Sequence, residues 1–88
     1  MPAYLITYDL SSETARQDLV AEIKAWPWVK LSETAYAIHT ADTAQTVYKQ
    51  LASFLGRDDV VYIVGLRQPF AGYGPDTVNA WLQQRLPR

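Results

Sequence analysis

Two short segments of the chain consist almost entirely of the residue types that favour β-strands. Residues 4–10 read YLITYDL, and residues 60–66 read VVYIVGL. Runs of aromatic and β-branched residues bounded by turn formers predict strands. The first run is apolar on both faces, and alternation sets Asp9 opposite the even-numbered side chains, so we expect a central strand. The second run is apolar almost throughout and is predicted to be buried as well.

Three other segments show the spacing of apolar residues that is typical of amphipathic helices. They are residues 13–26, residues 44–55 and a short last segment at residues 76–86. Serine, threonine and aspartate favour the N-cap of a helix, whereas proline and glycine end it. The expected caps and stops, in chain order, are Ser11 or Ser12, Pro27, Asp42 or Thr43, Gly56 in a left-handed conformation, and Asp76.

The stretch between the first two helices is extended but changes phase. Its apolar side chains occupy odd positions up to Leu31 and even positions from Tyr36 onward. Such a change needs a bulge or a tight turn, and Ser32-Glu33-Thr34 is the expected place. The stretch is therefore either one bent strand or a hairpin. Residues 67–75 contain two Pro and two Gly and predict a loop or an irregular edge strand.

The resulting order is βαββαβ, followed by a loop and a last helix. This order predicts an α+β fold of the ferredoxin-like type, in which a four-stranded antiparallel sheet carries both helices on one face. The 88 residues form a single domain, with a core at about residues 3–66 and an extension at residues 67–88. Only the last helix, the loop or a second subunit can cover the other face of the sheet.

Aromatic residues are numerous for so short a chain, with three Trp, six Tyr and two Phe. A small interior has little room for so many rings, so some of them are expected at an interface. We therefore predict a homodimer. It forms either through the uncovered sheet face or through residues 67–73, with Phe70 and Tyr73 at the interface.

Charge and cysteine content limit the classes of function. The formal net charge of −1 argues against a wide basic surface for nucleic acid, so such contact is confined to a local site. The absence of cysteine excludes disulfide frameworks, thiolate zinc sites and cysteine nucleophiles. No run is apolar and long enough for a membrane span or a signal peptide, so we expect a cytoplasmic protein without membrane contact.

Several short motifs point to a known family. They are Tyr8-Asp9-Leu10 at the end of the first strand, Arg16 in the first helix, Lys30-Leu31-Ser32 before Ala35-Tyr36, and Tyr62–Leu66. In these motifs the chain resembles the small spacer-acquisition protein of CRISPR systems and its relatives, the VapD-type toxin ribonucleases. The resemblance covers about residues 3–70. It implies a ferredoxin-like homodimer with an exchanged C-terminal strand, endonuclease activity, a role in antiviral defence and an integrase-type partner.

Asp9 is the strongest candidate for a catalytic residue, because ligand sites collect at the carboxyl ends of strands in open sheets. In a dimer packed through the uncovered face, two copies of Asp9 approach each other and hold Mg²⁺ or Mn²⁺, which activates water against a phosphodiester. Arg16 and Arg67 then clamp phosphate oxygens, and Ser32 adds a phosphate contact. Each residue also has a structural alternative: Asp9 as a turn or cap residue, Arg16 as the partner of Glu13, and Ser32 as a bulge.

Three functions remain open at this point. The first is a metal-dependent endonuclease that acts as a homodimer on RNA or DNA, with Asp9 as catalytic residue and metal ligand. The second is a non-catalytic dimeric scaffold that binds nucleic acid or a protein partner. The third is a small regulatory module that binds a protein through residues 67–75.

Overall fold

The computed structural model describes all 88 residues and is built on one four-stranded antiparallel sheet. The strands are β1 (Ala3–Asp9), β2 (Trp28–Ser32), β3 (Ala35–His39) and β4 (Val60–Leu66), which lie in the order β2-β3-β1-β4. The helices are α1 (Glu13–Ile23), α2 (Ala44–Leu51) and α3 (Asp76–Arg85), and a 3₁₀ turn, η1 (Ala52–Phe54), follows α2. The predicted α+β class and the central position of β1 are confirmed.

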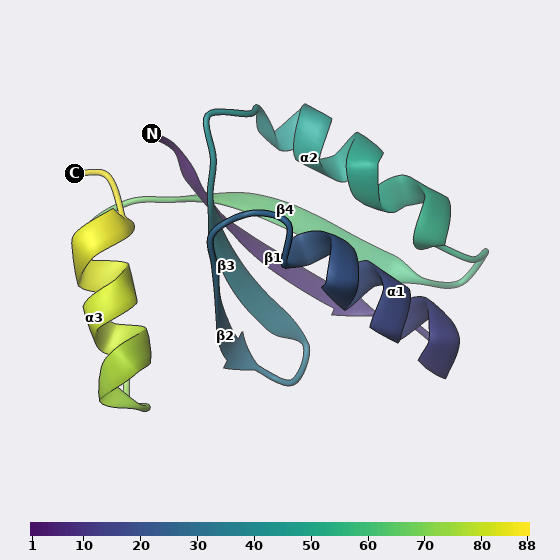
Figure 1. Ribbon diagram of the computed structural model, residues 1–88, viewed down its shortest axis with the longest axis horizontal. Coiled ribbons are helices and arrows are strands. Elements are labelled where there is room, and N and C mark those ends of the chain that lie inside the picture. Colours follow the sequence, from purple (N-terminus) through teal and green to yellow (C-terminus); the bar gives the residue numbers. More distant parts are fainter.

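The hydrophobic core lies between the sheet and the first two helices, which cover the same face (Figure 1). Ile6 of β1 and Ile38 of β3 are fully buried against α1 and α2, whose apolar stripes supply Leu19, Ile23, Val47 and Leu51. The rings of Tyr4 and Tyr8 are buried on the same face. Their hydroxyl groups donate hydrogen bonds to the carbonyl oxygens of Asp42 (2.8 Å) and Glu33 (3.0 Å), so the buried polar ends are satisfied. The alternation predicted for residues 4–10 is confirmed.

The last helix lies on the opposite side of the sheet from α1 and α2 (Figure 1). Val78 and Leu82 of α3 face Leu5 and Leu31 of the sheet across an apolar cavity of about 300 Å³. The helix therefore covers the second face of the sheet near β2. The last helix was one of the three elements expected to cover this face, together with the loop and a second subunit. The outer part of that face, along β4, remains uncovered.

The predicted helix ends are right at two caps and wrong at three other positions, Trp26, Asp76 and Gly56. Ser12 and Thr43 are the N-caps of α1 and α2, as expected. The first helix ends at Ile23 rather than Trp26, because the chain tightens into a turn before Pro27. The last helix begins after Pro75, with Asp76 already inside its first turn.

Gly56 does not adopt the predicted left-handed conformation, since no glycine of the chain has a positive φ. The helix has already tightened into η1 before it reaches this residue. The N–H of Gly56 instead donates to the carboxylate of Asp59 at 2.7 Å, and this contact closes the turn into β4.

The extended stretch at residues 29–40 is a hairpin of β2 and β3. The register between these strands shifts between Lys30 and Ser32, so the alternative of Ser32 as a bulge residue is confirmed. The hairpin turn brings the carbonyl of Thr34 to the N–H of Tyr8 at 3.1 Å.

The prediction that residues 60–66 are buried is wrong. β4 pairs only with β1 and is an edge strand, and the helices cover only one of its faces. The other face leaves Val60, Tyr62 and Val64 exposed by 44%, 64% and 47%. None of the helices combines the length and the apolar character needed to cross a membrane.

Candidate functional site

The part of the sheet that no helix covers exposes several large apolar side chains. Tyr62 lies opposite Thr7, and Val60 lies opposite Asp9, so side chains from β1 and β4 share this face. We call the face formed by Thr7, Asp9, Val60, Tyr62 and Val64 the uncovered half-sheet. Exposed apolar side chains gathered on one surface, rather than scattered singly, mark a site of interaction.

Asp9 lies at the end of the uncovered half-sheet and points away from α1 and α2, as predicted. Its carboxylate is exposed and takes part in no hydrogen bond or ion pair within the chain. No group of three or more His, Cys, Asp or Glu side chains in the chain is arranged to hold a metal ion. A single chain therefore offers Asp9 as an isolated carboxylate.

Arg16 lies near the same end of the sheet, but its guanidinium is already bound within the chain. It donates to the carbonyl oxygen of Leu10 at 2.7 Å and forms an ion pair with Glu13 one helical turn earlier. The hydrogen bond from Arg16 lowers the pKa of the Glu13 carboxyl, so the pair stays charged. The alternative of Arg16 as the partner of Glu13 is confirmed.

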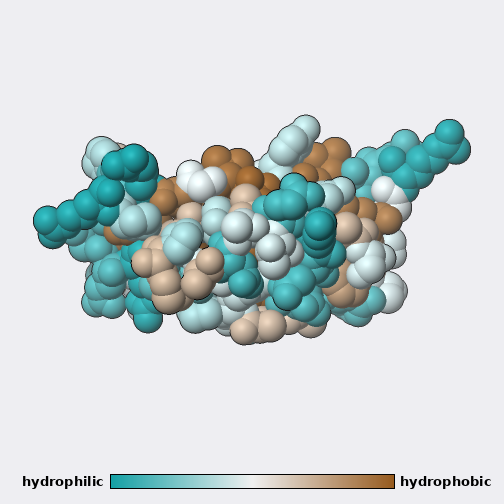
Figure 2. Space-filling model, turned by 90° about the horizontal axis from the view of Figure 1, so that it is seen from above, coloured by the Kyte–Doolittle hydropathy of each residue, from teal (hydrophilic) through white to brown (hydrophobic).

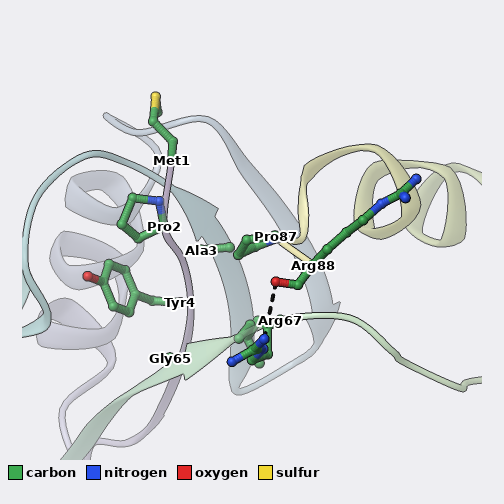
Figure 3. Close-up of a pocket in the computed structure, with 9 residues that line it drawn as sticks. Met1, Pro2, Ala3, Tyr4, Gly65, Arg67, Pro87 and Arg88 are labelled. Atoms are coloured by element: carbon green, nitrogen blue, oxygen red, sulfur yellow. Dashed lines mark hydrogen bonds between the residues drawn. The ribbon is translucent and has the colours of Figure 1, made fainter.

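Ser32 and Arg67 lie away from Asp9. Ser32 is on the far edge strand, and its row of the sheet runs through Ala35 and Thr7. Arg67 follows β4 at the opposite end of the sheet, about 20 Å from Asp9 along the strands. There its guanidinium donates to the carbonyl oxygen of Arg88 at 3.2 Å (Figure 3). The structure does not bring these residues together around Asp9.

Phe70 and Tyr73 belong to the loop between β4 and α3, which contains no strand. Both residues line the apolar cavity under α3, where Phe70 is half-buried. Tyr73 is fully exposed beside its two flanking glycines. Their predicted role at a dimer interface stays a prediction.

A shallow hollow of about 400 Å³ between α1 and the hairpin collects Arg16, Lys24 and Lys30. Each cation already has a partner within the chain: Glu13 for Arg16, the Trp28 ring at 4.6 Å for Lys24, and Glu33 at 3.1 Å for Lys30. Paired cations on an almost neutral chain have little charge left for phosphate groups.

Sequence reasoning overlooked Asp59, which anchors the end of the sheet near Asp9. Its carboxylate accepts hydrogen bonds from the Ser11 N–H at 3.0 Å and the Gly56 N–H at 2.7 Å. These N–H groups hold the pKa of the Asp59 carboxyl below its usual range. The signal in the sequence was the acidic pair Asp58-Asp59 directly before a strand. Aspartate is common in turns, where its carboxylate accepts hydrogen bonds from main-chain N–H groups that have no partner in a helix or strand.

The charged residues around β4 are unevenly placed. Asp58 and Asp59 precede the strand, whereas Arg67 follows it, and no charged residue lies between them. Figure 2 shows hydrophilic side chains extending at both ends of the long axis, with patches of hydrophobic side chains between them. Arg57 precedes the two aspartates, so the start of the strand carries a net charge of −1, whereas Arg67 makes its end positive.

No protein-family model matches the chain, and no curated protein matches it.

Proposed function

We propose that this chain is a non-catalytic scaffold that works as a homodimer and uses the uncovered half-sheet to bind protein. The observation that carries the proposal is the exposed apolar row of Val60, Tyr62 and Val64 beside the edge of the sheet. Apolar surface of this kind is stabilised when a second protein removes it from water. The element order βαββαβ and the strand order β2-β3-β1-β4 support a ferredoxin-like fold as its framework.

A protein partner is favoured over nucleic acid by the charges. The cations predicted to meet phosphate lie apart, and Arg16 is engaged by Glu13 and the Leu10 carbonyl. The uncovered half-sheet itself carries one charge, on Asp9, which is negative and repels phosphate. A protein partner therefore fits this surface better than RNA or DNA does.

The proposal is tested by the mass of the protein in solution, measured by light scattering after size-exclusion chromatography. We expect twice the 10.0 kDa of the single chain for the wild type at micromolar concentration. Tyr62→Lys should shift the mass towards the monomer. Tyr48→Lys is the matched control, because Tyr48 is 40% exposed on α2, away from the uncovered half-sheet. A wild type that remains monomeric at every concentration contradicts the proposal.

A second candidate function is a metal-dependent endonuclease of the type implied by the resemblance to the spacer-acquisition family. The observation in its favour is the exposed carboxylate of Asp9, which no group within the chain neutralises. Mg²⁺ is commonly held by one or two carboxylates together with substrate phosphates, so two Asp9 side chains from a face-to-face dimer fit such an ion. In this candidate Arg16, Ser32 and Arg67 contact the nucleic acid.

Nuclease assays with Mg²⁺, Mn²⁺ or EDTA test the second candidate. Asp9→Asn removes the charge of Asp9, and Asp18→Asn makes the same change on the exposed surface of α1. Cleavage of RNA or DNA that only Asp9→Asn and EDTA abolish would support the endonuclease. Cleavage that survives Asp9→Asn, or the absence of cleavage in every condition, contradicts it.

A further inference from the structure

The two edges of the sheet differ in how well they are protected against pairing with another strand. The β2 edge carries Lys30 and a bulge, and α3 packs against it. Charges and bulges are features that natural sheets use to block edge pairing. The β4 edge has seven residues, Val60–Leu66, without a charge, a proline or a bulge. It is therefore open to a further strand.

The main-chain groups that β4 presents outward can be identified from the pairing of β1. The Tyr8 N–H donates to Thr34 beside β3, so the polar groups of Thr7 and Asp9 point the other way, towards β4. Tyr62 and Val60 lie opposite them and point back to β1. The N–H and C=O groups of Val61, Ile63 and Gly65 consequently point outward. None of these outward groups has a hydrogen-bond partner in the chain.

These outward groups limit the registers in which a second copy can pair. In an antiparallel ladder an outward residue must face an outward residue. Centring the pair on Ile63 satisfies this rule and also overlaps the whole strand, from Val60 to Leu66. Ile63 then faces its own copy, Val61 faces the partner's Gly65, and the pairs exchange about six hydrogen bonds, since each bonded pair exchanges two.

The same register matches the charges at the two ends of β4. Continuing the ladder by one bonded pair sets Arg67 opposite the partner's Asp59, and the two-fold symmetry repeats this contact at the other end. Arg67 is exposed and uses one of its N–H groups on Arg88, so further donors remain free (Figure 3). Parallel pairing, in contrast, would set like charges side by side.

We infer that two copies of this chain join antiparallel along β4, in the register centred on Ile63, and form one continuous eight-stranded sheet. The inference rests on the proposed homodimer and specifies its contact. In this assembly the two Asp9 carboxylates lie about 25 Å apart, three strand spacings across and six residues along. The apolar rows of Val60, Tyr62 and Val64 then merge across the joint into one wider surface.

Disulfide trapping tests the register, because the chain contains no cysteine of its own. Tyr62 lies opposite the partner's Val64 in a non-bonded pair, with Cα atoms about 4.5 Å apart, within reach of a disulfide. Tyr62 lies about 8 Å from its own copy, which is too far. Tyr62 is 64% and Val64 47% exposed, and neither belongs to the buried core, so Tyr62→Cys and Val64→Cys leave the core intact. Mixed and oxidised, the two variants should give a reducible dimer, and each variant alone should not.

The outcomes separate this inference from the proposed function. A disulfide formed by Tyr62→Cys alone or by Val64→Cys alone indicates a shifted register and overturns the inference. A wild type that is dimeric but gives no disulfide in the mixture overturns edge pairing while the proposed homodimer stands. A wild type that is monomeric throughout contradicts both.

The charge match at the ends of β4 is tested separately. Arg67→Glu sets two acidic groups side by side at both ends of the joint, and we expect the dimer dissociation constant to rise by about tenfold. Arg88→Glu makes the same change in net charge at a side chain that points away from Arg67 (Figure 3). Equal effects of the two substitutions would show that the ends of β4 do not meet and would overturn the register.

Discussion

Deletion of the same two methyl groups should have very different effects at two valines of this chain. Val47 lies in α2 with no exposed surface, in contact with the core cluster. Val64 lies on the uncovered half-sheet and is 47% exposed. Val47→Ala and Val64→Ala are therefore a matched pair, because the chemical change is identical and only the surroundings differ.

The sizes of the two effects follow from burial. At Val47 the two groups lose about 1.6 kcal/mol of transfer free energy, at about 0.8 kcal/mol each. The cavity adds about 1 kcal/mol, and the better helix propensity of alanine returns about 0.5 kcal/mol, so the free energy of unfolding should fall by about 2 kcal/mol. At Val64 about half of the surface is already in water, so we expect a loss below about 1 kcal/mol.

Urea unfolding followed by circular dichroism measures both values, at a protein concentration low enough for the monomer to prevail. At high concentration Val64→Ala should also weaken self-association, whereas Val47→Ala should leave the dissociation constant of the folded chains unchanged. Equal losses of stability in the monomer would refute the reasoning, because Val64 would then be covered within a single chain.

Three other predictions concern the ends of the elements and the edge of the sheet. Thr43→Ala removes the hydroxyl that accepts from the Thr46 N–H at 3.1 Å, and thermal unfolding should show a loss of about 1 kcal/mol. The pKa of Asp59 is lower in the folded state, so its contribution to stability is present above the ordinary carboxyl pKa and is lost as the pH falls through the folded-state pKa. As the pH is lowered through this range, the free energy of unfolding of Asp59→Asn should therefore fall less than that of the wild type. Hydrogen exchange by NMR should show slow exchange of the outward amides of β4 in the dimer and fast exchange after dilution.

The parts of the fold that could be predicted from the sequence are those determined by nearby residues, namely the apolar periodicity of a segment and its capping residues. Alternation along residues 4–10 predicted which side chains of β1 are buried, because a central strand with helices on one face leaves no other arrangement. The caps Ser12 and Thr43 followed from side-chain chemistry next to apolar periodicity. The phase change at residues 32–34 predicted either a bulge or a tight turn, and the structure has both, a register shift in β2 and a hairpin turn into β3.

The position of β4 could not be predicted in this way. An apolar run is compatible with a buried strand and with an edge strand that a partner covers, and hydrophobicity alone does not distinguish them. The strand order decides the matter, since β4 has β1 on one side and nothing on the other. The position of the last helix on the sheet could not be predicted either, because its contacts with the sheet are formed by residues far apart in the sequence.

The candidate site was predictable only in part. The direction of Asp9 followed from alternation, and the bond of Arg16 to Glu13 followed from their helical spacing. The separation of Asp9 from Arg67 depends on the antiparallel pairing of β1 with β4, which sets the two residues at opposite ends of the sheet. Asp9 and Arg67 were predicted to act together, but they do not lie together in the structure.

Sedimentation equilibrium of two variants at Gly65 tests the central claim most directly. The Gly65 N–H points away from β1, and a Cβ atom at this position meets nothing within 4 Å. Gly65→Pro removes an outward donor without loss of a bond inside the chain, whereas Gly65→Ala keeps the donor. We predict that the wild type and Gly65→Ala sediment as dimers and that Gly65→Pro sediments as a folded monomer. A folded Gly65→Pro that dimerises as tightly as Gly65→Ala would contradict pairing through β4.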